Sequence, residues 1–259
     1  MRTPAGRAWQ HGDVSIPSFP VVSFGYAPIK GIRHEPRPID VDAHGPVGDR
    51  RWCLVDDQLK VLRTVQHLEL LAVRAHGLKQ LTVDFPGGAT VVSSPQPIGE
   101  QCTVDYWKRL VPATFAPSEL DAAFSDYLGA SVRLAQPERG AIVYGNPISI
   151  ITTASVRDLG ARLHAADFLD QAARFRATYL VDHDEAYAED AWRGKVIRLG
   201  EVLVEVTGAI GRCAVIDAHP TTGQRDLRVL RTLAGYRPRN DAGEPCFGVQ
   251  GRVVGTSKI

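Results

Sequence analysis

The pair Arg212–Cys213 is the point in this sequence where residue types and spacing most readily suggest chemistry. It follows an apolar, strand-like run and precedes a turn at residues 217–223, Asp-Ala-His-Pro-Thr-Thr-Gly. A neighbouring guanidinium and a turn rich in backbone donors favour the thiolate, which is both a nucleophile and a soft metal ligand. A lone cysteine beside a strand can also be a small buried hydrophobic residue, so the local pattern leaves both possibilities open.

The other three cysteines do not form a recognisable site with it. Cys53, Cys102 and Cys246 lie far from one another and from Cys213 in the sequence, and no Cys-x-x-Cys pair occurs. This spacing excludes a zinc ribbon and a dithiol redox motif, and it lacks the clustering of a four-cysteine iron–sulfur site. The alternation around Cys53 and Cys102 predicts that both side chains turn into a core.

Other common catalytic motifs do not occur. The sequence has no Gly-x-Ser-x-Gly, His-Glu-x-x-His or Walker motif, which removes local support for a serine hydrolase, a zinc peptidase or a nucleotide-binding enzyme. The eight histidines do not cluster, and we expect His183 in a solvated turn and His164 at a helix end. Glu189 and Asp190 suit a loop or the start of a helix, where the helix dipole favours negative charge.

The composition predicts a soluble globular protein of one or two domains. Of 259 residues, 44% are hydrophobic and 23% are charged, and the net charge is +1. This balance gives no global electrostatic reason to bind nucleic acid or an anionic membrane. Because no run has the length of a transmembrane helix or a secretory signal, we expect a cytoplasmic protein with a flexible arm at residues 1–20.

The elements that must position Cys213 are mostly short strands. Helices are expected at residues 118–129, capped by Ser118, in the strand-to-helix segment 146–163, and at residues 225–236. The fold class is therefore mostly β with a few helices, an α+β arrangement of two lobes joined near residues 137–147. Alternating or β-branched runs predict strands at residues 21–30, 50–65, 68–77, 78–85, 89–94, 101–110, 131–136, 173–182, 195–200, 202–208, 212–217 and 246–255.

Several longer motifs carry a family resemblance. FRATYLVD, YAEDAW, GEVLVEV, GRCAVIDAHPTTG and CFGVQGRVV follow one another between residues 175 and 254, and YAPIKG and GPVGDRRWCLVD precede them. The later motifs resemble the MOSC domain, named for the C-terminus of molybdenum cofactor sulfurase, and the earlier two resemble the β-barrel domain that precedes it. The resemblance implies a smaller N-terminal barrel over residues 21–136 and a MOSC barrel over residues 137–259.

The resemblance also implies a cofactor and the residues that bind it. It is strongest with the group of the mitochondrial amidoxime reducing component and its bacterial relatives, which bind a molybdopterin cofactor and reduce N-hydroxylated compounds. In that group the cysteine of the Arg-Cys pair ligates molybdenum, which here is Cys213 beside Arg212. The family's basic positions, which hold the anionic and polar parts of the cofactor, match Lys30, Arg50 and Arg176.

Further cofactor-binding positions follow from the same resemblance. The strand-to-helix turn places the hydroxyls of Thr152 and Ser155 where the family has a serine-rich turn, and a helix start suits an anion. Gly31, Thr178 and Gly211 occupy positions where the family usually carries a serine, an asparagine and a small polar residue, respectively.

Two functions of different classes remain open from the sequence. In the first, the protein is a molybdenum-dependent oxidoreductase that removes oxygen from a small N-hydroxylated or N-oxide substrate, with electrons from a separate reductase or ferredoxin, because the chain itself lacks iron–sulfur ligands. In the second, the domain holds no metal and Cys213 acts as a thiolate that carries a persulfide or attacks an electrophile. A binding protein with a degenerate pocket is a third, weaker possibility. The substrate, the electron donor, the oligomeric state and the completeness of the last strand are not specified by the sequence.

Overall fold

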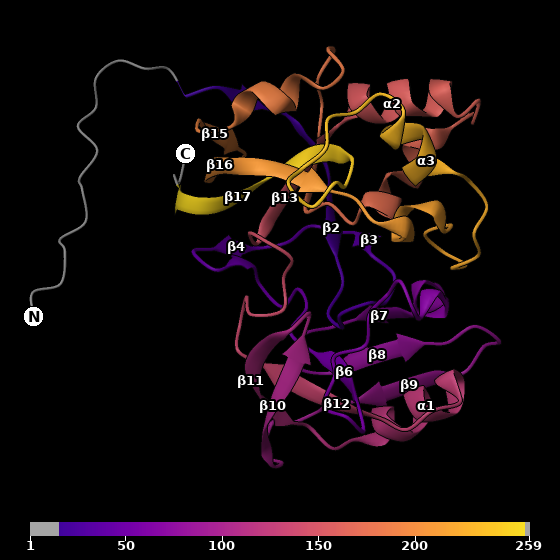
Figure 1. The fold of residues 1–259 in the computed structure, drawn as a ribbon. Coiled ribbons are helices and arrows are strands. Elements are labelled where there is room, and N and C mark those ends of the chain that lie inside the picture. Colours follow the sequence, from indigo (N-terminus) through magenta and orange to yellow (C-terminus); the bar gives the residue numbers. More distant parts are fainter. Residues whose placement is uncertain (1–15, 257–259) are drawn as a thin grey trace, which may run out of the picture.

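The computed structural model describes residues 16–256, which form two lobes, one above the other in Figure 1. Residues 1–15 of the expected flexible arm lie outside the described residues. The end of the expected arm is ordered, because β1 (Ser18–Phe19) pairs in parallel with β15 (Val196–Leu199).

One curled sheet forms the upper lobe, in the strand order β1-β15-β16-β17-β13-β14-β2-β3. Val204 and Val206 alternate with less buried residues along β16, so one face of the strand packs against the core. The register between β16 and β17 shifts between Ala209 and Gly211, just before the Arg212–Cys213 pair. The strands besides β1 and β15 are β16 (Val202–Gly211), β17 (Cys246–Thr256), β13 (Ile148–Thr152), β14 (Tyr179–Val181), β2 (Val21–Tyr26) and β3 (Glu35–Pro36).

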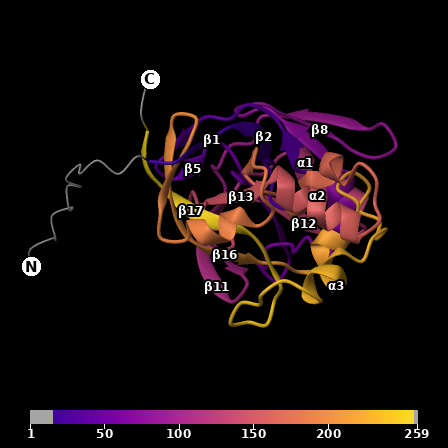
Figure 2. The same ribbon diagram turned by 90° about the horizontal axis from the view of Figure 1, so that it is seen from above.

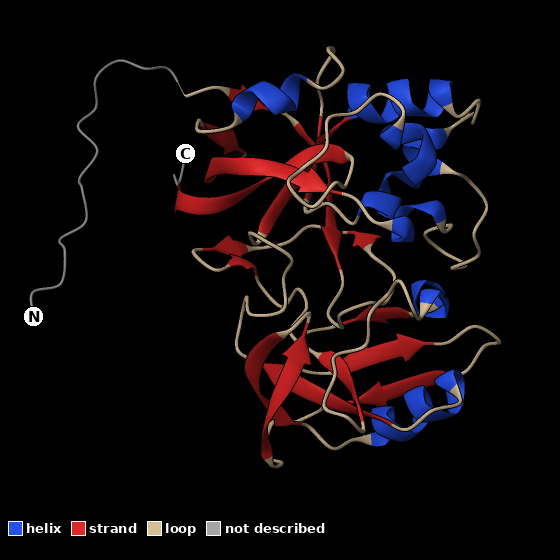
Figure 3. Ribbon diagram, viewed as in Figure 1, coloured by secondary structure: helices blue, strands red, loops and turns tan. Residues whose placement is uncertain are grey.

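Helices of this lobe gather beside the sheet. Figure 2 shows α2 and α3 on one side of β16 and β17, and Figure 3 shows the shorter helical turns around the sheet. Thr152 ends β13 and caps α2, because its side-chain oxygen accepts a hydrogen bond from the Ser155 amide at 3.3 Å. Within residues 16–256, no helix has both the length and the apolar character needed to span a membrane. The elements are α2 (Thr153–Arg162), α3 (Val229–Ala234) and the 3-10 helices η2 (Phe168–Phe175), η3 (Ala188–Trp192) and η4 (Ala214–Asp217).

Smaller sheets and one α-helix form the lower lobe. Its four-stranded sheet has the order β10-β11-β12-β6, and β7, β8 and β9 form a three-stranded sheet. The two sheets and α1 enclose a core that contains Trp52, Leu54, Leu70 and Phe124. The elements are β6 (Cys53–Asp56), η1 (Leu68–Ala72), β7 (Arg74–His76), β8 (Leu81–Asp84), β9 (Thr90–Ser93), β10 (Gln101–Tyr106), β11 (Arg109–Phe115), α1 (Glu119–Leu128) and β12 (Val132–Pro137). The short pair β4 (Val41–Asp42) and β5 (Gly45–Pro46) lies beside the upper lobe, where Val41 packs against the core of the large sheet.

The expected fold class is confirmed, and so are several expected elements. The helix expected at residues 118–129 is α1, although Ser118 makes no side-chain capping bond. The strand-to-helix segment is β13 followed by α2, and His164 comes just after that helix. The last strand, β17, reaches Thr256 and pairs with β16 along its length.

Other expected strands are helical turns instead. Residues 68–72 form η1, and the strand expected to begin at residue 173 begins at Tyr179, because Arg176 takes a left-handed conformation with φ of 51°. Residues 214–217 form η4 rather than a strand. A short apolar run such as AVI has no periodicity that distinguishes a strand from a helical turn. In the folded chain Val215 and Ile216 pack into different apolar clusters.

The chain does not divide between the lobes where expected. Strands β1 to β3, from residues 18–36, join the upper sheet, whereas residues 21–136 were expected to form the first domain. The Gly25 amide donates to the Thr178 carbonyl at 3.0 Å, and a Cβ on Gly25 would lie 2.2 Å from the Ala177 carbonyl oxygen. This long-range pairing depends on tertiary packing, which the local pattern around residue 25 does not encode.

The turn after Cys213 joins the two lobes. The Arg33 side chain donates to the carbonyls of Leu71 at 3.3 Å and Thr221 at 2.6 Å. Leu71 also packs with Val215 and Ala218 in a small apolar cluster that includes residues of both lobes. Gly223, with φ of +73°, lies so close to the lower lobe that a Cβ would stand 2.0 Å from the Leu68 carbonyl oxygen.

Gly223→Ala should weaken the junction between the lobes. Its positive φ already disfavours a side chain, and the Cβ would meet backbone that cannot move without separating the lobes. We expect a loss of about 3 kcal/mol or more in the free energy of unfolding, measured by urea titration.

Gly194→Ala is the matched control. Gly194 has φ of +77° and nothing within 4 Å of its Cβ position, so we expect a loss of only about 1 kcal/mol. Equal losses in the two variants would contradict a packing role for Gly223.

Candidate functional site

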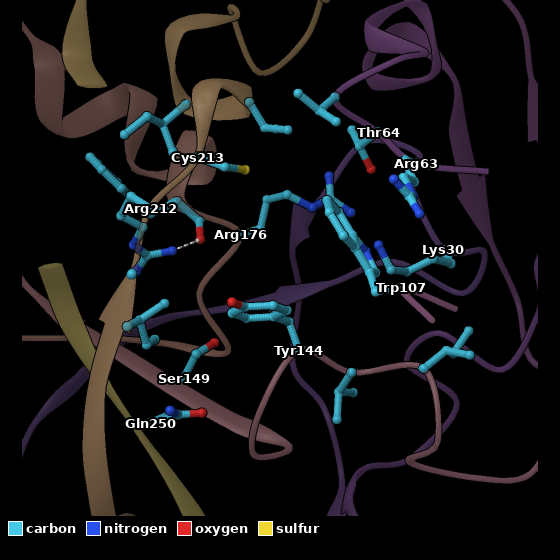
Figure 4. Close-up of a pocket in the computed structure, with 18 of the residues that line it drawn as sticks. Lys30, Arg63, Thr64, Trp107, Tyr144, Ser149, Arg176, Arg212, Cys213 and Gln250 are labelled. Atoms are coloured by element: carbon cyan, nitrogen blue, oxygen red, sulfur yellow. Dashed lines mark hydrogen bonds between the residues drawn. The ribbon is translucent and has the colours of Figure 1, made fainter. Parts of the chain in front are cut away.

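A cavity of about 270 Å³ lies between the lobes (Figure 4). The lower lobe contributes residues 63–65 and 106–107, and the upper lobe contributes the end of η2, the end of β16 and the start of η4. The residues with chemical interest that line it are Lys30, Arg50, Arg63, Trp107, Tyr144, Arg174, Arg176, Gly211, Arg212, Cys213 and Glu244.

Cys213 presents the thiol in this cavity. It is the residue before η4, at the point where the chain leaves β16, and its side chain is exposed. Cys53 is buried and Cys102 is half-buried against the lower core, as expected, and Cys246 is also buried. Of the four cysteines, all within the described residues, Cys213 alone lines the cavity, which rules out the buried-hydrophobic interpretation for this residue.

The Arg212 side chain, next to Cys213 in the sequence, is fixed by burial and by hydrogen bonds. It is 7% exposed, and its guanidinium donates to the Phe247 and Phe175 carbonyls, each at 2.8 Å. Gly248, with φ of +75°, makes room, because a Cβ there would lie 3.3 Å from Arg212 Nη2 and 2.5 Å from the Ile150 carbonyl oxygen. Burial lowers the pKa of Arg212 to about 10, so it stays protonated near neutral pH.

Lys30, Arg50 and Arg176 form a cationic group across the cavity from Cys213 (Figure 4 labels Lys30 and Arg176). Arg176 donates to the Ile32 carbonyl at 2.7 Å, and Arg50 pairs with Asp49 at 2.7 Å. Burial, followed by the charges of Arg176 and Arg50, lowers the pKa of Lys30 to about 7. Burial and Arg50 lower the pKa of Arg176 to about 10.

Two buried donors of these arginines have no hydrogen-bond partner. They are Nη2 of Arg176 and Nη2 of Arg212. An unsatisfied, buried guanidinium nitrogen is costly, and an anion in the cavity would satisfy it while relieving the repulsion among Lys30, Arg50 and Arg176. The cavity therefore suits a ligand with a phosphate-like anionic group and a soft atom for the thiol to bind.

Six of the ten residues expected in the site line the cavity: Lys30, Arg50, Arg176, Gly211, Arg212 and Cys213. Gly31 follows Lys30 with φ of +103° and packs near Leu70 and Thr64 rather than lining the cavity. Thr178 is buried behind Ser149, and its amide donates to the Ser149 hydroxyl at 2.9 Å.

Thr152 and Ser155 bind the carboxylate of Glu189 and do not line the cavity. Their hydroxyls lie 3.0 and 2.9 Å from Oε2 of Glu189, and none of these three residues lines the cavity. Glu189 lies in the first turn of η3, which agrees with the expected helix start, and it is fully buried. Burial raises the pKa of Glu189, and the two hydroxyls oppose that rise. The structure thus gives these hydroxyls a role in holding the strand-to-helix turn against η3.

Sequence reasoning missed several lining residues. Arg63 stacks over the Trp107 ring at 4.3 Å, and Trp107 has φ of 55° in the tight turn between β10 and β11. Arg174 is buried and pairs with Asp226 at 2.6 Å, which ties η2 to the segment after Cys213. Arg174 and Arg176 were visible in the sequence as two basic residues at the start of the strand expected at residues 173–182, but nothing local marks Arg63 or Trp107.

A metal in this cavity would have few protein ligands. No group of three or more His, Cys, Asp or Glu side chains placed to hold a metal occurs among residues 16–256. Among the His, Cys, Asp and Glu side chains of the described residues, Cys213 and Glu244 line the cavity, and Cys213 is the soft donor of the two, which suits a metal that carries other ligands of its own.

Comparisons with known proteins agree with these features. The profile of the MOSC domain family matches residues 128–259, slightly more than half of the chain. Molybdenum cofactor sulfurase of Oryza sativa subsp. japonica is 32% identical over 108 residues, which are 39% of this chain and 13% of that protein. Mitochondrial amidoxime-reducing component 1 of Danio rerio is 37% identical over 92 residues, 35% of this chain and 27% of that protein.

A third relative is similar over more of the chain. Molybdenum cofactor sulfurase of Drosophila grimshawi is 26% identical over 221 residues, 78% of this chain and 28% of that protein. The chain therefore aligns with less than a third of the length of each of these three relatives.

Lys30→Met should change stability in a pH-dependent way. Because the pKa of Lys30 falls from 10.5 to about 7 on folding, the charged form costs stability below about pH 7, and the cost fades as pH rises towards 10.5. In protein free of bound anions, we expect the free energy of unfolding of the variant to be about 1–3 kcal/mol higher than that of the wild type near pH 6. The difference should be smaller near pH 9.5, and urea titration at the two pH values measures it.

Lys79→Met is the control for this prediction, because Lys79 is exposed outside the cavity. The difference in the free energy of unfolding between Lys79→Met and the wild type should be the same near pH 6 and near pH 9.5. An excess stability of Lys30→Met that grows with pH would contradict the assigned burial of the amine.

Proposed function

The chain belongs to the MOSC domain family, and we propose that its inter-lobe cavity binds a molybdenum cofactor for the reduction of small N-oxygenated compounds. The observation that carries the proposal is the exposed Cys213 thiol in a cavity that is also lined by Lys30, Arg50 and Arg176, of which Arg176 has an unpartnered Nη2. A soft ligand and unsatisfied anion-binding donors in one cavity match the two chemical ends of such a cofactor.

Each residue of the cavity has a distinct part in this proposal. Cys213 would bind the metal, and Lys30, Arg50 and Arg176 would hold the anionic tail of the cofactor. Arg212 would keep a fixed positive charge behind the thiol, because both of its carbonyl partners hold it in place. Gly31, Thr152, Ser155 and Thr178, which do not line the cavity, would act only through the residues that they support.

When bound, the cofactor supplies the two-electron redox chemistry that removes oxygen from an N–O bond. The protein residues would bind it and orient it, and Ile142, Val143 and Ile210 contribute apolar walls to the same cavity. The overall reaction turns an N–OH group into N–H and water, and it consumes an electron pair and protons. A separate reductase or ferredoxin would supply the electrons, since the four cysteines of this chain do not cluster.

The alternative function uses the same thiol without a metal. The relatives named molybdenum cofactor sulfurase favour it, together with the exposure of Cys213. In this alternative Cys213 carries a persulfide, and an acceptor nucleophile takes the outer sulfur and leaves the thiolate. The cationic group around Lys30 and Arg176 supports the first function over this one, because sulfur transfer alone does not require it. A cytoplasmic location remains a prediction.

Metal analysis separates the two functions. Protein purified from a host that makes the molybdenum cofactor should contain about one molybdenum per chain by elemental analysis, and Cys213→Ala should lose it, because the thiol is the protein ligand. Cys102→Ala, which removes a half-buried thiol outside the cavity, should keep the wild-type metal content.

Metal-free protein in which alkylating reagents modify Cys213 would favour the sulfur-transfer alternative. Full molybdenum content in Cys213→Ala would contradict both the ligand assignment and the proposed function.

A further inference from the structure

Asp49 places a carboxylate beside the cationic group of the cavity without lining the cavity itself. Its Oδ2 lies 2.7 Å from Nη1 of Arg50, and the Asp49 side chain is 5% exposed. A negative charge at this place opposes the binding of an anion by Lys30, Arg50 and Arg176. Its contacts therefore decide whether it has another task in the site.

Both oxygens of the Asp49 carboxylate accept hydrogen bonds. Oδ1 accepts from the Ala27 amide at 2.9 Å, and Oδ2 accepts from Nη1 of Arg50. His34 is a further titratable neighbour, with Nε2 at 3.9 Å from Oδ1. Burial, followed by the charges of Arg176 and Arg50, lowers the pKa of His34 well below its usual value. The imidazole is therefore neutral near neutral pH, and Arg50 is the charged partner of Asp49.

The backbone of Arg50 is held by the same residue that binds Asp49. The Arg50 amide donates to the Ala27 carbonyl at 2.7 Å, so both polar backbone groups of Ala27 bind this turn. Arg50 takes a left-handed conformation with φ of 47°. This conformation is unfavourable for a residue with a side chain, and it persists where the surrounding contacts enforce it. The strain is an independent sign that the direction of Arg50 matters.

The same pairing of segments carries Lys30. Its amide donates to the Trp52 carbonyl at 2.8 Å, so residues 27–30 run beside residues 50–52. Asp49 stands at the start of this pairing and binds the first residue of the opposite segment. The carboxylate thus fixes the backbone that brings two of the three cations together.

The Arg50 side chain keeps donors for a ligand. Within residues 16–256, its guanidinium makes one hydrogen bond, to Asp49. A guanidinium has five N–H donors in a rigid planar fork, so the donors that do not bind Asp49 are available to an oxyanion in the cavity. Because the fork is rigid, a carboxylate that binds one of its nitrogens also fixes the direction of the others.

We propose that Asp49 is a positioning residue, which holds the Arg50 guanidinium in the direction that binds a phosphate-like group in the cavity. Asp49 acts through Arg50 and does not touch the ligand, since it does not line the cavity. The inference rests on the proposed function for the source of that group, which is the anionic tail of the cofactor. Inorganic phosphate shares its chemistry and serves as the probe.

The sign of one substitution separates this role from a purely electrostatic one. If Asp49 acted only through its charge, Asp49→Asn would strengthen phosphate binding, because a negative charge beside the anion would be gone. If Asp49 holds Arg50, the same variant weakens it. The asparagine oxygen can still accept from the Ala27 amide, whereas its NH₂ group would face the Arg50 guanidinium with donor against donor.

Phosphate binding by the full chain without cofactor measures the effect. Protein from a host that cannot make the molybdenum cofactor would be titrated with inorganic phosphate at neutral pH by calorimetry. We expect Asp49→Asn to weaken phosphate binding about tenfold, because Arg50 loses the partner that directs it. In an Arg50→Gln background, the same substitution should change phosphate binding less than about twofold, because no guanidinium remains for Asp49 to hold.

Asp42→Asn is the matched control. Asp42 has the same pattern of bonds as Asp49, because its Oδ1 accepts from the His44 amide and its Oδ2 pairs with Arg139. Neither Asp42 nor Arg139 lines the cavity, so phosphate binding should change less than about twofold in this variant. The thermal midpoint of each variant shows whether it is folded.

A crystal structure of the wild type with bound phosphate gives a measurement that does not depend on the folding of any variant. The bond from Arg50 Nη1 to Asp49 Oδ2 should persist, with the phosphate against the remaining donors of Arg50. A phosphate that replaces Asp49 as the partner of Arg50 would overturn the inference.

Unchanged or tighter phosphate binding in Asp49→Asn, or an equal loss with and without Arg50, would also overturn it. Molybdenum content of protein from a host that makes the cofactor tests the proposed function by itself. A chain that shows the coupling of Asp49 and Arg50 but holds no molybdenum would refute the proposed function and support the inference. Because phosphate titration needs no cofactor, the two failures are distinguishable.

Discussion

Repulsion among three partly buried cations is the constraint around which this molecule is organised. Lys30, Arg50 and Arg176 come from separate parts of the chain. At the lobe junction burial, followed by the charges of Arg176 and Arg50, lowers the pKa of Lys30 to about 7. Such an arrangement costs stability unless an anion occupies the cavity. The apolar cores of the two lobes and the contacts of Arg33 and Gly223 supply the stability that holds these charges together.

The thiol is useful because the same junction keeps it accessible. The register of β16 shifts just before Arg212, the chain turns into η4, and the Cys213 side chain is left exposed in the cavity. Arg212 itself is buried and bonded to two carbonyls, so its charge is fixed while the neighbouring thiol is free to react or ligate. Of these two adjacent residues, Arg212 is therefore fixed by the fold, whereas the Cys213 side chain is accessible in the cavity.

The sequence predicted a large part of the fold but only part of the site. Alternation and capping patterns identified the β-rich class, α1 and the β13–α2 segment, because these depend on local periodicity. Lys30, Arg50 and Arg176 could be grouped only through a family resemblance, since their proximity is long-range. Thr152 and Ser155 were expected at the cofactor, but Glu189, which was expected in a loop or at a helix start, is buried and accepts hydrogen bonds from both hydroxyls. Glu244 carries no sequence signal, because its position depends on a loop that folds against Gly211.

The most direct test is where a bound metal lies in the folded protein. A crystal structure of the molybdenum-loaded protein, with anomalous scattering recorded at the molybdenum edge, would locate it. The account predicts one anomalous peak within bonding distance of Cys213 Sγ, with the density of an anionic tail against Lys30, Arg50 and Arg176. An anomalous peak away from Cys213, or a tail that leaves those three cations facing solvent, would contradict it.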